Sequence, residues 1–264
     1  MDNRPVGLFD SGVGGLTVFE QVVRIMPRES VVYFGDTAHV PYGGRSTDDL
    51  VQLGDRIIRF LLTQNVKCVI FACNTSSSVS IGILRERYPV PMIGLVEPGA
   101  KAAVKATVNK RIGLLATEAT VKSGSYPKAI AGFDPGVKVF SEAAPLLVPL
   151  VETGRTDTYE AKEALAKYLT PLKQAGIDTL ILGCTHYPFF KQYIADILGS
   201  EAALVDPAEA TVIEAQAELS RRGMLAVADK VRHDFFVSGD AGEFNRLAGR
   251  LCSGLSLQAT RVDI

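Results

Sequence analysis

The sequence is poor in cysteine, and four cysteines are too few for a disulfide scaffold in a chain of 264 residues. It contains no apolar run that approaches the roughly 20 residues needed to span a bilayer. Its first residues, Met-Asp-Asn-Arg-Pro, lack the basic and then apolar pattern of a secretory signal. These absences predict a soluble cytoplasmic protein with reduced thiols and no membrane partner.

The chain also has no marked excess of charge of either sign. It contains 28 Lys and Arg residues against 29 Asp and Glu residues, for a net charge of −1. A nucleic acid or an anionic membrane surface is therefore not expected as the main partner, whereas a small anionic ligand remains compatible. The 47% of hydrophobic residues is ordinary for a globular protein, and a chain of this size can bury a large core.

Short apolar runs alternate with longer amphipathic segments. This alternation is typical of α/β proteins whose parallel sheets are covered by helices on both faces. The predicted strands span residues 6–10, 31–35, 69–72, 92–96, 112–116 and 180–183. The predicted helices span residues 46–64, 156–175 and about 208–222.

Three segments of the first half resemble three segments of the second half in the same order. Residues 6–11 resemble 112–117, residues 69–75 resemble 180–186, and residues 96–98 resemble 205–207. The offsets are nearly constant, from 106 to 111 residues. This regularity predicts a duplication and two similar α/β lobes, each of roughly 100 residues.

The residues after the second repeat contain further elements. A helix, a strand at 234–237, a second helix near 241–251 and a last strand are predicted there, and we expect this tail to return to the first lobe. The first lobe would then comprise residues 1–97 plus 208–264, and the second would comprise 98–207. Open α/β sheets bind ligands beyond the carboxyl ends of their strands, so a cleft between two pseudo-two-fold-related lobes is the expected active site.

Two cysteines, Cys73 and Cys184, stand at equivalent places in the repeat, each directly after a predicted strand. Each is followed by polar residues that are predicted to enter a helix. A helix N-terminus stabilises a thiolate, so we expect the pKa of these thiols to lie below the ordinary value of about 8.5. A buried free cysteine is often only a packing residue, which is the interpretation we favour for Cys68 and Cys252.

Several kinds of chemistry could use two opposed thiols. A disulfide or a metal site is possible, but no CxxC occurs, and the three histidines, His39, His186 and His233, have a poor spacing for zinc. A nucleophilic Cys-His site would explain only one of the two cysteines. Two acid/base groups on opposite faces of a carbon atom would explain both, because one can remove a proton while the other delivers one.

A glycine-rich loop, Asp10-Ser11-Gly12-Val13-Gly14-Gly15, follows the first predicted strand. It matches neither GxGxxG nor the GK[ST] ending of a P-loop. Its glycines would allow a ligand to approach closely, and Asp10 could hold an ammonium group or assist a thiol. A simple tight turn is the alternative interpretation.

Three further features, one segment and two single residues, have two interpretations each. The backbone amides of Tyr42 and Gly43 could bind a carboxylate, or the segment could be a turn with a packing tyrosine. Glu152 could neighbour the cleft or be a solvated acid. His186 could assist Cys184 or make a structural hydrogen bond.

Taken together, these motifs resemble glutamate racemases over nearly the whole chain, least closely after Arg222. The motifs that carry the resemblance are Asp10-Ser11-Gly12-Val13-Gly14-Gly15-Leu16, Gly35-Asp36-Thr37, Pro41-Tyr42-Gly43, Cys73-Asn74-Thr75, Glu97-Pro98-Gly99-Ala100 and Leu182-Gly183-Cys184-Thr185-His186-Tyr187-Pro188. The resemblance implies a cofactor-independent interconversion of L- and D-glutamate that supplies D-glutamate for bacterial peptidoglycan. No metal is implied.

The resemblance also implies roles for individual residues. Cys73 would face the α-proton of D-glutamate and be assisted by Asp10. Cys184 would face the α-proton of L-glutamate and be assisted by Glu152 and His186. The residues implied in substrate binding are Asp10, Ser11, Tyr42, Gly43, Asn74, Thr75, Thr185 and His186.

Two positions depart from the family pattern. His39 stands where members often carry arginine, and Ser76 stands where they often carry alanine. Both departures affect the expected loop contacts and leave the pair of thiols unchanged. The resemblance leaves a homodimer open. The rivals are an aspartate racemase of the same superfamily, a catalytically silent binding protein, and a pyridoxal-phosphate racemase. The last would need a Schiff-base lysine and a phosphate cradle, and we identify neither.

Overall fold

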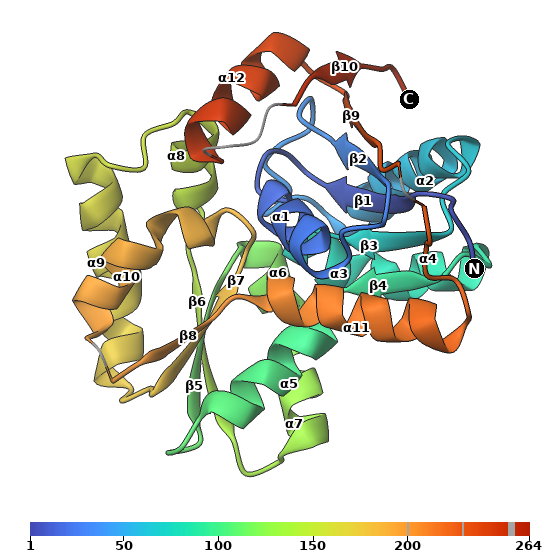
Figure 1. The fold of residues 1–264 in the computed structure, drawn as a ribbon. Coiled ribbons are helices and arrows are strands. Elements are labelled where there is room, and N and C mark those ends of the chain that lie inside the picture. The colour runs from blue at the N-terminus through green and yellow to red at the C-terminus, as the bar shows by residue number, and fades with distance from the viewer. Residues whose placement is uncertain (200, 229, 253–256) are drawn as a thin grey trace.

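The computed structural model describes residues 1–199, 201–228, 230–252 and 257–264. Within these residues the chain forms two parallel sheets flanked by helices, which confirms the predicted α/β class with two lobes. Figure 1 shows the sheets side by side, with helix α11 (Pro207–Arg221) running alongside both. No described helix is long and apolar enough to cross a membrane.

The first sheet contains six described strands in the order β10-β9-β2-β1-β3-β4. These strands are β1 (Val6–Asp10), β2 (Val31–Gly35), β3 (Cys68–Phe71), β4 (Met92–Gly94), β9 (His233–Val237) and β10 (Ala259–Arg261). All of their described pairings are parallel. The C-terminal strands β9 and β10 extend this sheet beyond β2, so the tail of the chain pairs with its beginning.

The second sheet has the described order β6-β5-β7-β8. Its strands are β5 (Arg111–Ala116), β6 (Lys138–Ala143), β7 (Thr179–Gly183) and β8 (Ala203–Val205). This order repeats that of β2-β1-β3-β4, with β1 equivalent to β5 and β3 equivalent to β7. The equivalence explains two of the three repeated pairs, because residues 6–11 and 112–117 overlap β1 and β5, and residues 69–75 and 180–186 overlap β3 and β7.

The helices begin where side chains can satisfy free amide groups. Ser46 caps α2, Thr158 caps α9 and Asp206 caps α11, each by accepting a backbone N–H bond. The helices around the first sheet are α1 (Leu16–Ile25), α2 (Thr47–Thr63), α3 (Asn74–Val79), α4 (Ile81–Arg87) and α12 (Ala241–Leu251). Those around the second are α5 (Val96–Ala106), α6 (Glu118–Ser123), α7 (Ser125–Phe133), α8 (Leu147–Glu152), α9 (Tyr159–Gln174) and α10 (Lys191–Leu198).

Two predicted boundaries lie two or more residues from the observed ones, and the edge strands β6 and β8 of the second sheet were not predicted. The strand predicted at 92–96 ends at Gly94, because Val96 already begins α5. The helix predicted from residue 156 begins at Tyr159, after its cap. Strand β6 was not predicted, because its half-exposed edge position allows Lys138, Ser141 and Glu142 among its six residues.

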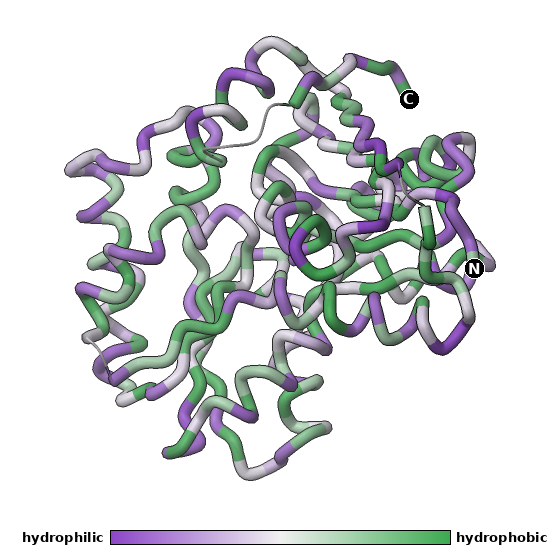
Figure 2. The backbone as a smooth tube through the Cα atoms, viewed as in Figure 1, coloured by the Kyte–Doolittle hydropathy of each residue, from purple (hydrophilic) through white to green (hydrophobic). Residues whose placement is uncertain are grey.

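The core lies on both faces of each sheet. Every residue of β1, β2, β3 and β7 is buried, and the tube in Figure 2 alternates between polar and apolar colours along the outer helices. Helix α11 packs against both α1 and α5, so it contacts helices of both lobes. Each fully buried Leu or Phe side chain contributes about 1.5–3 kcal/mol, so these faces supply most of the folding free energy.

A buried ion pair lies at the amino end of the first sheet. Lys67 Nζ lies 2.5 Å from Glu29 Oε2, and neither side chain is more than 2% exposed. The same ammonium donates to the carbonyl oxygens of Asp2 and Met224, and Glu29 Oε1 accepts the N–H of Ala226. The pair therefore joins the N-terminus to the segment that follows α11.

Candidate active site

The residues that could take part in catalysis lie at the carboxyl ends of three central strands. Asp10 is the last residue of β1, Cys73 directly precedes α3, and Cys184 directly follows β7. All three side chains are buried, with Cys73 4% and Cys184 6% exposed. Because β3 and β7 are equivalent strands, the two thiols occupy equivalent positions in the two lobes.

Cys73 is buried beside Ser11, Ser76 and the Asp10 carboxylate. Its Sγ lies 3.9 Å from the hydroxyl oxygen of Ser11. Burial and the charge of Asp10 raise the pKa of Cys73 to about 11, although the N–H and hydroxyl of Ser76 act in the opposite direction. The expectation of a lowered pKa was therefore wrong for this thiol, because desolvation outweighs the amide groups at the start of a short helix.

Cys184 lies beside a histidine and a carboxylate. Its Sγ lies 3.7 Å from His186 Nδ1, and His186 Nε2 lies 2.6 Å from Glu152 Oε1. Burial alone would lower the pKa of His186, but its hydrogen bonds with Cys184 and Glu152 hold that pKa well above the ordinary value. The three side chains thus form a line from the end of α8 to the sulfur, with His186 favoured as an imidazolium.

The segment after Cys184 differs from the predicted helix. Thr185 and His186 lie in a turn, a 3₁₀ turn follows at Tyr187–Phe190, and α10 begins only at Lys191. His186 rather than a helix N-terminus is therefore the feature that acts on the Cys184 thiol.

Asp10 connects the two lobes. Its Oδ1 accepts the N–H of Gly12, and its Oδ2 accepts the hydroxyl of Thr185 at 3.2 Å. Burial raises the pKa of Asp10, while the charge of His186 and the amides of Gly12 and Gly15 oppose the change. The carboxyl group is thus held by donors from both halves of the site.

The glycine-rich loop makes room for side chains of the opposite lobe. A Cβ atom on Gly14 would lie 2.5 Å from His186 Nδ1 and 2.8 Å from Thr185 Oγ1. A Cβ atom on Gly12 would overlap the Glu152 carboxylate. The loop also holds Glu152 directly, since the N–H of Val13 donates to Oε1 at 3.1 Å. A carboxylate so placed is not a solvated surface acid.

The Tyr42 side chain is buried and hydrogen-bonded to Asp36, while its backbone amide remains available to a ligand. The Tyr42 hydroxyl donates to Asp36 Oδ2 at 2.5 Å, and Asp36 Oδ1 also faces His39 Nδ1 at 2.7 Å. The amide N–H groups of Tyr42 and Gly43 make no hydrogen bond to any other described residue. Two such amides on one loop can bind a carboxylate, while His39 contributes to holding the loop.

Asn74 and Thr75 contact residues that the sequence analysis missed. Thr75 Oγ1 lies 2.9 Å from Thr117 Oγ1, which is also bonded to Thr120, and Asn74 Oδ1 accepts the hydroxyl of Tyr126. A signal for Thr117 was present, because the repeat pairs residues 6–11 with 112–117 and so aligns Thr117 with Ser11. Nothing in the sequence pattern indicated Tyr126.

The structure thus brings the predicted site residues to one buried region at facing strand ends. Within the described ranges, no group of three or more His, Cys, Asp or Glu side chains is arranged to hold a metal ion. Cys68 and Cys252 are buried and free, Cys68 at the start of β3 and Cys252 at the end of α12.

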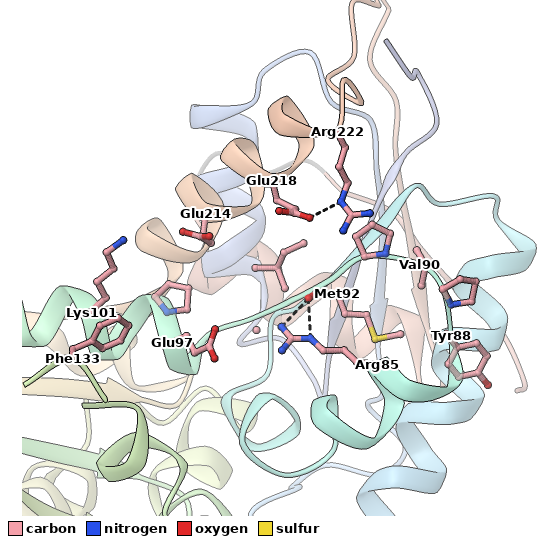
Figure 3. A pocket seen from close by; sticks show the side chains of 15 residues that line it. Arg85, Tyr88, Val90, Met92, Glu97, Lys101, Phe133, Glu214, Glu218 and Arg222 are labelled. Atoms are coloured by element: carbon pink, nitrogen blue, oxygen red, sulfur yellow. Dashed lines mark hydrogen bonds and ion pairs between the residues drawn. The ribbon is translucent and has the colours of Figure 1, made fainter. Parts of the chain in front are cut away.

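Two open hollows lie elsewhere, with volumes of about 550 and 560 Å³. The first is drawn in Figure 3, where it is lined by the charged side chains of Glu97 and Lys101 on α5, of Glu214 and Glu218 on α11, and of Arg222 directly after α11. The second adjoins it, since both are lined by Arg85 and Phe133. No predicted site residue lines either hollow among the residues described, so we place the chemistry at the facing strand ends.

The sequence matches the profile of the Asp/Glu/Hydantoin racemase family over residues 7–215. This match covers most of the chain, including both cysteine segments and the glycine-rich loop. The chain belongs to this family.

Relatives within the family match along nearly the whole length. The chain is 54% identical to a glutamate racemase of Desulforudis audaxviator over 252 residues, which are 93% of this chain and 92% of the relative. It superposes on the glutamate racemase isoform RacE1 of Bacillus anthracis with a TM-score of 0.96 at 37% identity, covering 100% and 99% of the two chains. The glutamate racemase of Francisella tularensis in complex with D-glutamate gives 0.92 at 31% identity, covering 100% and 98%.

Proposed function

We propose that the chain is a glutamate racemase, which interconverts L- and D-glutamate by a two-base mechanism without a cofactor. The observation that carries the proposal is the equivalence of Cys73 and Cys184, which follow β3 and β7 in two lobes of the same strand order. Two thiols related by a pseudo-two-fold can face opposite sides of one carbon. The names of the relatives described above supply the substrate.

In the direction from L-glutamate, Cys184 is the base. The imidazolium of His186 directs its Nδ1–H at the Cys184 sulfur, and Glu152 accepts the Nε2–H, so the thiolate has a positive neighbour. The thiolate takes the α-proton: the C–H bond breaks, an S–H bond forms, and the electron pair stays on the α-carbon.

Cys73 then completes the inversion as the acid. Its raised pKa keeps it in the thiol form at neutral pH, ready to donate a proton to the opposite face. The S–H bond breaks and a new C–H bond forms, which gives D-glutamate and a Cys73 thiolate. In the reverse direction, the substrate ammonium group near Asp10 would favour that thiolate.

The carbanion and the substrate carboxylates need donors placed in advance. Hydroxyl and amide groups of Ser11, Asn74, Thr75 and Thr185 flank the thiols, and the free amides of Tyr42 and Gly43 suit a carboxylate. Burial of the four side chains and of Tyr42 excludes water and so strengthens these interactions.

Several broader assignments accompany this function. We propose that the enzyme acts in the cytoplasm and that its product, D-glutamate, is used for peptidoglycan. We also propose lobe limits of 1–97 plus 208–264 and of 98–207. Strands β9 and β10 in the first sheet and the passage of α11 along both lobes support these limits.

The test compares two substrates on the metal-depleted protein. After dialysis against a chelator, the protein is incubated with L-glutamate or with L-aspartate, and the enantiomers are separated by chiral chromatography. We expect glutamate to reach a 1:1 mixture with aspartate turned over far more slowly. Preference for aspartate would assign the rival substrate, and a loss of activity restored by zinc would make Cys184 and His186 metal ligands. Activity that needs added pyridoxal phosphate would also contradict the proposal.

A further inference from the structure

We propose that Tyr126 is a positioning residue, whose hydroxyl orients the Asn74 amide so that its NH₂ group is presented to the substrate. The inference rests on the proposed racemase function. The two residues come from helices on different sheets, since α3 follows β3 and α7 lies between β5 and β6. The Tyr126 hydroxyl lies 2.6 Å from Asn74 Oδ1.

The direction of this hydrogen bond follows from what each group can do. Burial raises the pKa of Tyr126, so its hydroxyl keeps its proton and must donate it. An amide offers an acceptor on one branch and two donors on the other. With Oδ1 facing Tyr126, the hydroxyl proton has an acceptor. With the amide turned over, both the proton and Oδ1 would lack partners, which is the less stable arrangement.

This orientation leaves the donor branch of Asn74 unused by the protein. Asn74 is 2% exposed, and its Nδ2 makes no hydrogen bond to any other described residue. A buried unpaired donor is unfavourable, so such groups generally mark a place where a ligand or water accepts. Asn74 directly follows Cys73 at the start of α3, so its free donor belongs to the same strand end as the thiol.

The hydroxyl that sets this orientation is itself held in place. Tyr126 is fully buried, and a Cβ atom on Gly99 would lie 3.3 Å from its hydroxyl oxygen and 3.0 Å from Pro207. Gly99 belongs to α5 and Pro207 begins α11, the helix that contacts both lobes. Close packing by these two elements leaves the ring little freedom to carry its hydroxyl away from Asn74.

The experiment is a double-mutant cycle with Tyr126→Phe and Asn74→Ala, measured on both enantiomers of glutamate. Removal of the hydroxyl lets the Asn74 amide turn, so Y126F should lower kcat/KM about 10-fold. In the N74A background the same change should have less than a two-fold effect, because there is no amide left to orient. Tyr88→Phe is the matched control, since its hydroxyl bonds to Asp55 outside the site, and it should keep wild-type kinetics.

A third variant separates the two branches of the amide. Asn74→Asp keeps an acceptor for Tyr126 and removes the donor, so it should lose as much activity as N74A. Equal losses from Y126F in both backgrounds would assign Tyr126 a packing role only and overturn the inference. Wild-type activity in Y126F or in N74D would also overturn the inference. An inactive wild-type protein would instead overturn the proposed function, and the two failures are therefore distinguishable. N74D also tests the inference if Y126F fails to fold.

Discussion

Glu152 and His186 form an ion pair with an Oε1–Nε2 distance of 2.6 Å, in which His186 is buried and Glu152 is 17% exposed, and the other nitrogen of His186 faces the Cys184 sulfur. The carboxylate contributes to holding the pKa of His186 well above its ordinary value. Glu152 reaches this position because Gly12 has no side chain and Val13 donates its N–H. This line of three side chains places an imidazolium beside the Cys184 thiol.

Removal of the Glu152 charge should therefore change the pH dependence of racemisation. In Glu152→Gln the pKa of His186 falls, so the imidazolium is lost at a lower pH, and the alkaline limb of kcat/KM moves to lower pH. At pH 8 we expect a loss of about 10- to 100-fold. Glu160→Gln, which removes an exposed partner of Arg155, is the control and should keep the wild-type profile. An unshifted limb in E152Q would contradict the role of the carboxylate.

The two thiols should be equally indispensable. Cys73→Ala and Cys184→Ala should each abolish racemisation of both enantiomers, because each inversion needs one base and one opposed acid. Cys68→Ala and Cys252→Ala are matched controls at buried free cysteines outside the site and should keep substantial activity. Because the two enantiomers have equal free energies in water, kcat/KM must be equal in both directions for every active variant. Near-normal turnover by C73A or C184A would remove the two-thiol mechanism.

The glycine loop should tolerate no side chain at Gly14. A Cβ atom there would displace His186 and Thr185, and a shift of about 1 Å at a reacting group can lower activity by about 100-fold, the loss expected for Gly14→Ala. Gly249→Ala in α12 is the control, because its Cβ would meet no atom within 4 Å. This control should keep full activity and gain about 0.5–1 kcal/mol of stability. Wild-type kcat/KM in G14A would show that the loop does not fit the site closely.

Much of this site was predictable from the sequence. The polar residues after the apolar strands mark the carboxyl ends of a parallel sheet, where ligands bind, and the repeat indicated that Cys73 and Cys184 are equivalent. The resemblance then assigned Glu152 and His186. Strand β6 was missed because an edge strand needs little apolar sequence, and Tyr126 was missed because its role depends on which helices pack against each other. The raised pKa of Cys73 depends on three-dimensional burial, which a local helix signal does not report.

The buried ion pair between Lys67 and Glu29 should matter for stability and not for catalysis. Lys67→Met leaves a buried unpaired carboxylate, so we expect the free energy of unfolding in urea to fall by about 3–5 kcal/mol. At 25 °C the folded variant should keep kcat/KM within two-fold of wild type. Lys162→Met, which removes an exposed ammonium, should change stability by about 1 kcal/mol or less.

A second variant tests the physical reason. In the double variant Glu29→Gln/Lys67→Met the uncompensated charge is gone, so the loss of stability should be smaller than in K67M alone. A double variant that is less stable than K67M would contradict this explanation.

The central claim, that Cys73 and Cys184 act as independent acid and base on opposite faces, is tested most directly by early turnovers in deuterated water. Reactions that start from L- or from D-glutamate are stopped at low conversion, and both the product and the remaining substrate are analysed by mass spectrometry. The account predicts deuterium at the α-carbon of the product from the first turnovers, because the donating thiol has already exchanged with solvent. Recovered substrate should stay largely protiated, because internal return uses the original proton. Substantial transfer of protium into the product from both enantiomers would contradict two separate thiols and indicate a single base that serves both faces.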